Sequence, residues 1–209
     1  MKKICIADNF PVVLNGLKQH FESIPSVNVV ATASNLEELL QQLQKKDIDV
    51  IVMDIDLSGV HSVRDVKALL KDFPTTKIVI FTNVSENMYA PTLFKAGVSA
   101  YITKTTKLKD IDATLIKVAN GEIVISENAQ KQIELLGRGK KSERLFKKLS
   151  TRETEVLRYL NDGKKNKEVA EILGLDEKTI STYKLRLLAK LNVTNLVDLL
   201  HKAKSLNVI

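Results

Sequence analysis

The stretch around Asp54 carries the residue types that phosphoryl chemistry needs. Asp54 follows Val50–Met53, which is apolar at every position, and Asp56 lies two residues further along. An apolar run without alternation is typical of a strand that helices cover on both faces of a parallel sheet. In such sheets the ligand site lies beyond the carboxyl ends of the strands, so we expect Asp54 there. A buried carboxylate also needs a compensating cation or hydrogen-bond donors.

Polar residues end three other apolar segments. They are Asp8 and Asn9 after residues 3–7, Thr82 after residues 77–81, and Lys104 after residues 100–103. Acidic and amide oxygens suit Mg²⁺, while a hydroxyl and an ammonium group can bind phosphoryl oxygens around a carboxylate nucleophile. One threonine or lysine at a strand end is usually a turn or solvated residue, but the joint placement favours a phosphoryl-transfer site. The Mg²⁺ site that we predict comprises Asp8, Asn9, Asp54 and Asp56.

The elements that must position these residues alternate regularly over the first part of the chain. Strands are expected at 3–7, 27–33, 50–53, 77–81 and 100–103, with helices around 11–21 and 36–43 and at 63–70, 88–96 and 108–118. Alternation of this kind predicts an α/β domain, a (βα)5 parallel sheet with helices on both faces. We place this domain at residues 1–122.

The pattern changes after Gly121. Short helices are expected at 151–160, 166–173, 177–191 and 196–203. Two short helices joined by a three-residue turn containing Gly174, followed by a longer helix, are typical of a helix-turn-helix. We therefore predict a small all-α four-helix domain at 147–209. We predict that residues 123–146 form a linker, with a helix at 126–136 and a basic, glycine-containing run after it.

The net positive charge arises in the second part of the chain. Residues 1–125 carry 14 Lys plus Arg against 14 Asp plus Glu, whereas residues 126–209 carry 18 against 11, so the net charge of +7 arises there. This asymmetry favours a nucleic-acid-binding domain. A solvated basic surface without a partner is the alternative that charge alone leaves open.

The segment 177–191 has one face suited to packing and another suited to DNA. Ile180, Leu187 and Leu191 share a face at helical spacing, and Asp176 is placed to cap the start of the helix. The opposite side carries the residues expected to contact bases, which are Lys178, Ser181, Thr182 and Leu185. Residues expected to contact phosphates are Asn166, Lys167, Thr179, Lys184 and Arg186.

The sequence offers no signal for a membrane or an oxidising compartment. No apolar run approaches the roughly 20 residues of a membrane span, and the start does not resemble a signal peptide. The single Cys5 lies in an expected core strand, where we predict a reduced thiol without a function. We expect a cytoplasmic protein.

With these motifs in view, residues 1 to about 120 resemble a response-regulator receiver domain of the flavodoxin-like, CheY-like fold. Residues 149–191 resemble a LuxR-type helix-turn-helix, so the whole chain resembles a NarL/FixJ-family response regulator. The run 178–184 and the tail 196–200 are most similar to the BvgA/EvgA branch. The resemblance implies Asp54 as the phosphoacceptor, Asp8 as a metal-site acid, and Thr82, Tyr101 and Lys104 as the residues that respond to the phosphate. It also implies Mg²⁺ as a cofactor, with a sensor histidine kinase, DNA, a second copy of the chain and RNA polymerase as partners.

Three positions depart from the family pattern. Asn9 stands where most receivers have a second acid, Ser58 replaces a usual proline, and Asn83 is larger than the usual neighbour of Thr82. Losing one formal charge at residue 9 should weaken metal binding. The alternative within this architecture is a pseudo-receiver that regulates transcription without phosphorylation.

Two rivals belong to other classes. A phosphatase of the haloacid dehalogenase type is suggested by the spacing of Asp54 and Asp56, but those enzymes carry their paired aspartates on the first core strand. A flavodoxin-like electron carrier would need a Ser/Thr/Gly-rich phosphate loop after the first strand, which this sequence lacks. We expect a regulator rather than an enzyme, with at most slow self-dephosphorylation.

Overall fold

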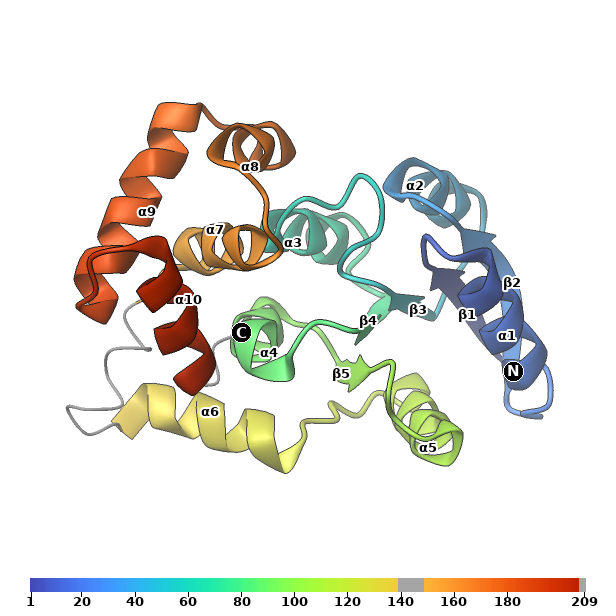
Figure 1. Cartoon of the computed structure of the whole chain (residues 1–209). Coiled ribbons are helices and arrows are strands. Elements are labelled where there is room, and N and C mark those ends of the chain that lie inside the picture. Colours follow the sequence, from blue (N-terminus) through green and yellow to red (C-terminus); the bar gives the residue numbers. More distant parts are fainter. Residues whose placement is uncertain (139–148, 207–209) are drawn as a thin grey trace. The chain divides into compact units, whose positions relative to one another are not determined.

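The computed structural model describes residues 1–138 and 149–206, coloured along the chain in Figure 1. The chain divides into two compact units. One comprises Met1–Glu86 with Thr92–Glu127, and the other comprises Asn87–Pro91 with Asn128–Ile209. The predicted domain bounds stay a prediction, and much of the predicted basic linker run lies outside the described residues.

The first unit is built on a five-stranded sheet, as predicted. Its strands are β1 (Lys2–Ala7), β2 (Val27–Ala33), β3 (Val50–Met53), β4 (Lys77–Thr82) and β5 (Ala100–Thr103). Every pairing is parallel and the order is β2-β1-β3-β4-β5. The chain therefore moves to one side of β1 to form β2 and to the other side for all later strands. The carboxyl ends of β1 and β3 meet at this reversal, which is where open α/β sheets place their ligand sites.

The helices that alternate with these strands follow the predicted order. They are α1 (Pro11–Phe21), α2 (Leu36–Lys45), α3 (Val63–Asp72), α4 (Glu86–Ala96) and α5 (Leu108–Ala119). Local signals explain the starts: Pro11 occupies the first turn of α1, Asn35 caps α2, and Ser62 forms a capping box with Asp65. Helix α4 begins two residues before its predicted start at Met88, because the polar residues ahead of the apolar face are also helical.

Helices cover both faces of the sheet. On one face, Phe21 of α1 and Leu115 of α5 pack against alternate strand residues such as Ile4 and Val52. Helices α2, α3 and α4 lie on the other face (Figure 1). Leu39 of α2 is fully buried there. The strands are thus apolar on both sides because both sides are covered.

The second unit is helical. It contains α6 (Glu127–Arg138), α7 (Thr151–Asn161), α8 (Asn166–Leu173), α9 (Glu177–Leu191) and α10 (Leu196–Ser205). Helix α7 begins with a capping box between Ser150 and Glu153, and Gly174 ends α8 in the left-handed conformation at φ 61°. A shared core that includes Val169, Leu187 and Leu199 joins the last four helices. Over the part of the chain that the structure describes, no helix is both long and apolar enough to cross a membrane.

Candidate phosphoacceptor site and DNA-reading helix

The register of β1 and β3 brings two acidic side chains to the same edge of the sheet. Ala7 pairs with Met53, so the next residues, Asp8 and Asp54, leave their strands side by side. The backbone N–H of Asp54 donates a 2.9 Å hydrogen bond to the Ala7 carbonyl, which extends the pairing by one step. Both carboxylates are buried, with 1% of Asp8 and 4% of Asp54 exposed. Their charges therefore need partners within the fold.

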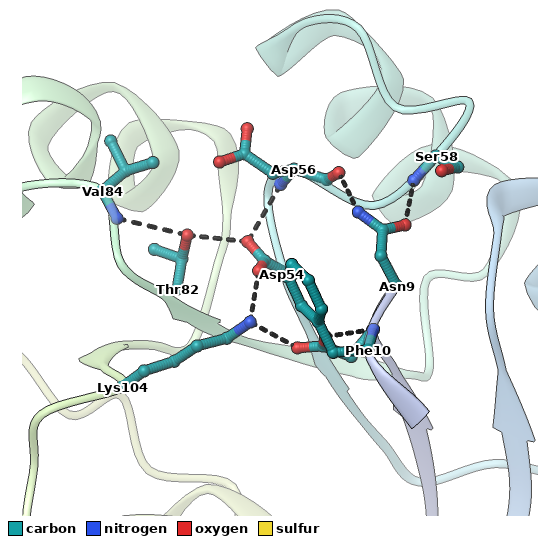
Figure 2. A network of polar contacts seen from close by, with 9 residues as sticks. Asn9, Phe10, Asp54, Asp56, Ser58, Thr82, Val84 and Lys104 are labelled. Carbon is teal, nitrogen blue, oxygen red and sulfur yellow. Dashed lines mark hydrogen bonds and ion pairs between the residues drawn. The ribbon is translucent and has the colours of Figure 1, made fainter. Parts of the chain in front are cut away.

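Three donors hold the Asp54 carboxylate (Figure 2). Oδ1 accepts hydrogen bonds from the Thr82 hydroxyl at 2.7 Å and from the Asp56 backbone N–H at 2.9 Å. Oδ2 accepts one from Lys104 Nζ at 2.5 Å. The side chain is fixed from β4, from β5 and from its own loop. Predicted residues from three strand ends thus meet at one carboxylate.

Lys104 balances both acids. Its Nζ lies 2.5 Å from Oδ2 of Asp8 as well as 2.5 Å from Oδ2 of Asp54. The rings of Phe10 and Phe81 flank the ammonium, with centroids at 5.5 and 5.9 Å. Burial opposes the charge on Lys104, but the hydrogen bonds and negative charges of Asp54 and Asp8 outweigh it and raise the lysine pKa above its usual range.

Asn9 joins β1 to the loop that follows Asp54. Its side-chain Nδ2 donates to the Asp56 carbonyl at 2.7 Å, and its Oδ1 accepts from the Ser58 backbone N–H at 2.7 Å. Both bonds are visible in Figure 2. We call this pair of hydrogen bonds the Asn9 clamp. Neither bond was predicted from the sequence, where Asn9 was treated only as a metal ligand.

The two other predicted residues lie at the margin of the Asp54 network. The Asp56 side chain is exposed, and its carboxylate points away from Asp54 in Figure 2. Tyr101 is buried, and its hydroxyl donates to the Val84 carbonyl at 2.9 Å. The Val84 backbone N–H in turn donates to the Thr82 hydroxyl at 3.4 Å. Tyr101 is therefore connected to the site through the segment that follows β4.

Asp8 and Asp54 fit a weak Mg²⁺ site. Oδ2 of Asp8 is a buried oxygen that is paired with the Lys104 ammonium at 2.5 Å. Such an oxygen can serve a hard cation, and Mg²⁺ needs few protein ligands. Within the described residues, however, no three His, Cys, Asp or Glu side chains come together as metal ligands. The buried carboxylates of Asp8 and Asp54 are therefore the two charged groups that fit the ion.

Helix α9 presents a polar surface of the kind predicted for DNA contact. Lys178, Thr182, Leu185 and Arg186 are exposed, and Leu185 is 65% exposed to solvent. Ile180 and Leu187, on the opposite face, are fully buried in the helical core. The predicted division of the helix into a packed face and a free face is therefore present. Lys167, at the start of α8, is exposed as well.

Two of the predicted DNA contacts are bonded to each other. Asn166 Nδ2 donates to Ser181 Oγ at 3.1 Å, and Ser181 Oγ donates to the Glu177 carbonyl at 3.1 Å. The hydroxyl hydrogen of Ser181 is thus used within α9, and Asn166 ties α8 to α9. Asp176 occupies the N-cap position as predicted, but its side chain makes no capping hydrogen bond. Thr179 and Lys184 are partly buried.

Sequence reasoning missed one supporting pair in this unit. Glu153 is 2% exposed, and it accepts a 2.6 Å hydrogen bond from Lys190 Nζ. Glu153 also accepts from the Ser150 backbone N–H at 2.6 Å. The pair joins the start of α7 to the end of α9. The capping-box spacing of Ser150 and Glu153 was a usable signal for the cap, but the Lys190 partner 37 residues away was not readable.

Two parts of the chain match known protein families. Residues 4–116 match the response regulator receiver domain, and residues 147–203 match the bacterial regulatory proteins of the luxR family. The chain belongs to the NarL/FixJ family of response regulators. It is a two-component regulator with a DNA-binding LuxR-type domain, and members of this family regulate transcription rather than catalyse metabolic reactions. The haloacid dehalogenase and electron-carrier alternatives are thereby excluded.

Full-length relatives support the same assignment for this response regulator. A putative transcriptional regulator of Pseudomonas aeruginosa is 32% identical over 207 residues, covering 98% of each chain. The nitrate/nitrite response regulator NarP of Escherichia coli is 30% identical over 200 residues, covering 93% of this chain and 91% of NarP. The solved structure of RcsB from Salmonella typhimurium has a TM-score of 0.80 at 26% identity, covering 99% of both chains. The particular similarity to the BvgA/EvgA branch stays a prediction.

Proposed function

We propose that a partner histidine kinase phosphorylates Asp54 and that this modification controls DNA binding through α9. The observation that carries the proposal is the arrangement of Thr82 and Lys104 on the two oxygens of Asp54, at 2.7 and 2.5 Å. A hydroxyl and an ammonium held in place at a buried carboxylate are the groups that stabilise a phosphoryl group there.

The chemistry follows from these contacts. An oxygen of Asp54 attacks the phosphorus of a phosphohistidine, the O–P bond forms as the N–P bond breaks, and the imidazole leaves. Lys104 and the Thr82 hydroxyl exchange their bonds to the carboxylate for bonds to phosphoryl oxygens. Mg²⁺ bound by Asp8 and Asp54 would neutralise further charge on the phosphoryl group. Water attack on the acyl phosphate would give the slow self-dephosphorylation that we also propose.

The same bonds suggest how the signal leaves the site. When Thr82 turns toward a phosphoryl oxygen, its 3.4 Å contact with the Val84 N–H must change. Val84 is also the acceptor for the Tyr101 hydroxyl at 2.9 Å. Modification of Asp54 would therefore shift a pre-existing equilibrium of this segment and of the Tyr101 ring.

DNA binding is assigned to the exposed side of α9 and the start of α8. We propose that Lys178, Thr182 and Leu185 contact bases, because they are exposed on the face opposite the core. The proposed phosphate contacts are Asn166, Lys167, Thr179, Lys184 and Arg186, with Ser181 as a further base contact through its remaining lone pair. RcsB, which is similar to this chain over its full length, has been solved with DNA and as two dimers on two parallel DNAs. We extend both properties to this chain and propose a homodimer that binds two half-sites.

Three further proposals rest on the sequence pattern and on the family. They are RNA polymerase as a partner, the cytoplasm as the location, and domain limits at 1–122, 123–146 and 147–209. The metal roles of Asn9 and Asp56 are also proposals.

A second function is favoured by the way Asp54 is already satisfied. Thr82, Lys104 and the Asp56 N–H donate three hydrogen bonds to the carboxylate, and Lys104 compensates its charge. A regulator that binds DNA in this state without phosphorylation is consistent with such a site. It predicts DNA affinity that does not respond to a phosphodonor.

One experiment separates the two functions. The purified chain is incubated with a small-molecule phosphodonor across a Mg²⁺ titration, and phosphorylation is read on a phosphate-affinity gel beside Asp54→Ala. We expect a shifted band that the variant lacks, together with tighter operator binding by the phosphorylated protein. Absence of the band at every Mg²⁺ concentration contradicts the phosphorylation proposal and leaves the unphosphorylated regulator.

A further inference from the structure

The Asn9 clamp uses both functional groups of one amide. The Nδ2 group donates to a carbonyl and the Oδ1 atom accepts from an N–H, each at 2.7 Å. An amide side chain carries a donor and an acceptor on neighbouring atoms, so it can serve a backbone carbonyl and a backbone N–H at the same time. An aspartate of the same size could still accept from Ser58, but it has no hydrogen to donate to the Asp56 carbonyl.

The clamp closes a loop that is also held at other points. The Asp56 N–H donates to Asp54 Oδ1 at 2.9 Å, and the Leu36 N–H at the start of α2 donates to the Ser58 carbonyl at 2.7 Å. The segment from Asp54 to Ser58 is therefore tied to its own acid, to β1 and to α2.

An acid at residue 9 would leave this loop with an electrostatic conflict. Its carboxylate would face the Asp56 carbonyl oxygen at the distance of a hydrogen bond, so two acceptors would meet with no hydrogen between them. Two buried carboxylates lie nearby already, at Asp8 and Asp54. A cation that binds both oxygens would remove the conflict.

We propose that Asn9 is a positioning residue whose amide holds the loop after Asp54 in its ordered conformation without a metal ion. The clamp performs the bridging that a cation would otherwise perform, and Mg²⁺ has to compete with Asn9 for the Asp56 carbonyl oxygen. This inference rests on the proposed function only in taking Asp54 as the phosphoacceptor. It makes the geometry of the loop independent of Mg²⁺ and makes Mg²⁺ binding weak.

The test measures the loop directly, on the unphosphorylated full-length chain without DNA. Exchange of the Ser58 backbone amide is followed by NMR in EDTA and in Mg²⁺, and Mg²⁺ affinity is measured by calorimetry. The variants are Asn9→Asp and Asn9→Ala. Ser58→Ala is the matched control, because the clamp uses the backbone of Ser58 and not its hydroxyl. Slow exchange of the Val52 amide in β3 confirms that each variant is folded.

Wild type and Ser58→Ala should exchange this amide slowly and equally in EDTA and in Mg²⁺. In EDTA the amide of Asn9→Ala should exchange roughly tenfold faster, because its acceptor is lost. Asn9→Asp should become Mg²⁺-dependent, with faster exchange in EDTA, protection restored by the ion, and Mg²⁺ bound roughly tenfold or more tightly than by wild type.

Two results would overturn the inference. One is a wild-type Ser58 amide that is protected only in Mg²⁺, and the other is an Asn9→Asp loop that Mg²⁺ does not affect. The phosphodonor experiment is independent of this readout. If Asp54 cannot be phosphorylated while the exchange pattern is as expected, the proposed function fails and the clamp stands.

Discussion

Lys104 Nζ and Asp8 Oδ2 lie 2.5 Å apart as an ion pair in the interior of the receiver unit. The same ammonium donates a hydrogen bond to Asp54. One lysine therefore compensates two buried carboxylates, and the side chain of Lys104 is itself only 10% exposed. The stability of the site and its readiness for a phosphoryl group depend on the same cation.

Replacing Lys104 by Met should destabilise the receiver unit by about 3 kcal/mol at neutral pH, because two buried carboxylates would lose their common counter-charge. Urea unfolding measures this loss. Lys104→Arg is the control, since it keeps the charge. A variant as stable as wild type would show that solvent, and not Lys104, balances the two acids.

The contribution of Lys104 to stability should fall as the pH rises. Because the folded-state pKa of Lys104 is raised, its contribution is fully present below the ordinary lysine pKa of 10.5 and is lost as the pH rises through the folded value. Wild type should therefore lose stability relative to Lys104→Met in alkaline solution. A gap between them that stays constant above pH 10.5 would contradict this assignment.

Thr82→Val should separate phosphorylation from its consequence. The valine keeps the shape of the fully buried side chain and removes the 2.7 Å hydrogen bond to Asp54, at a stability cost of about 1 kcal/mol. The variant should still accept a phosphoryl group, but operator affinity should rise far less on phosphorylation than in wild type. Thr82→Ser should restore the response, and a full response in Thr82→Val would remove the hydroxyl from the mechanism.

Substitutions on the exposed side of α9 should affect specificity and affinity in different ways. Leu185→Ala should leave thermal stability unchanged, because the side chain is 65% exposed, and should cost about 1 kcal/mol of operator binding while relaxing the preference at one base pair. Lys167→Ala should weaken binding to all sequences alike and lower the salt slope by about one. Fluorescence anisotropy with an operator and a scrambled duplex distinguishes these outcomes. The assignment fails if both variants act alike.

Acid should destabilise the helix-turn-helix unit through Glu153. Burial opposes the charge on Glu153, but the hydrogen bonds from Lys190 and from the Ser150 N–H outweigh it and hold its pKa below the usual value of 4.5. Its contribution is present above pH 4.5 and is lost as the pH falls through the folded value. Glu153→Gln should lower the melting temperature at neutral pH and flatten the acid dependence. Melting temperatures that fall equally with acid in both proteins would argue against the Glu153–Lys190 pair.

The elements were predictable because their signals are local. The apolar run Val50–Met53 defined β3 without error, and Gly174 with the short helices around it defined the helix-turn-helix. The Asp54 cluster was predictable as well, since parallel strands place their carboxyl ends together and the residues at those ends can be read directly.

The clamp and the Ser181 contact were not predictable for the opposite reason. Asn9 meets residues 47 and 49 positions away, in a loop whose path depends on how β1 and β3 pair. Asn166 and Ser181 looked like two independent DNA contacts, because a sequence does not show that one polar group has already satisfied the other. Hydrogen bonds between distant segments are fixed by register, and single-residue chemistry does not encode register.

The strand order affects how fast the first unit folds. Every pairing in the order β2-β1-β3-β4-β5 is parallel, so each one closes across at least one complete helix. The carboxyl-terminal unit is instead helical over its described residues, so a larger share of its contacts lies within single helices. Non-local pairing slows folding, whereas local contacts accelerate it. After rapid dilution from denaturant, the carboxyl-terminal unit should therefore refold first, and a chain still emerging from the ribosome would begin with its slower half.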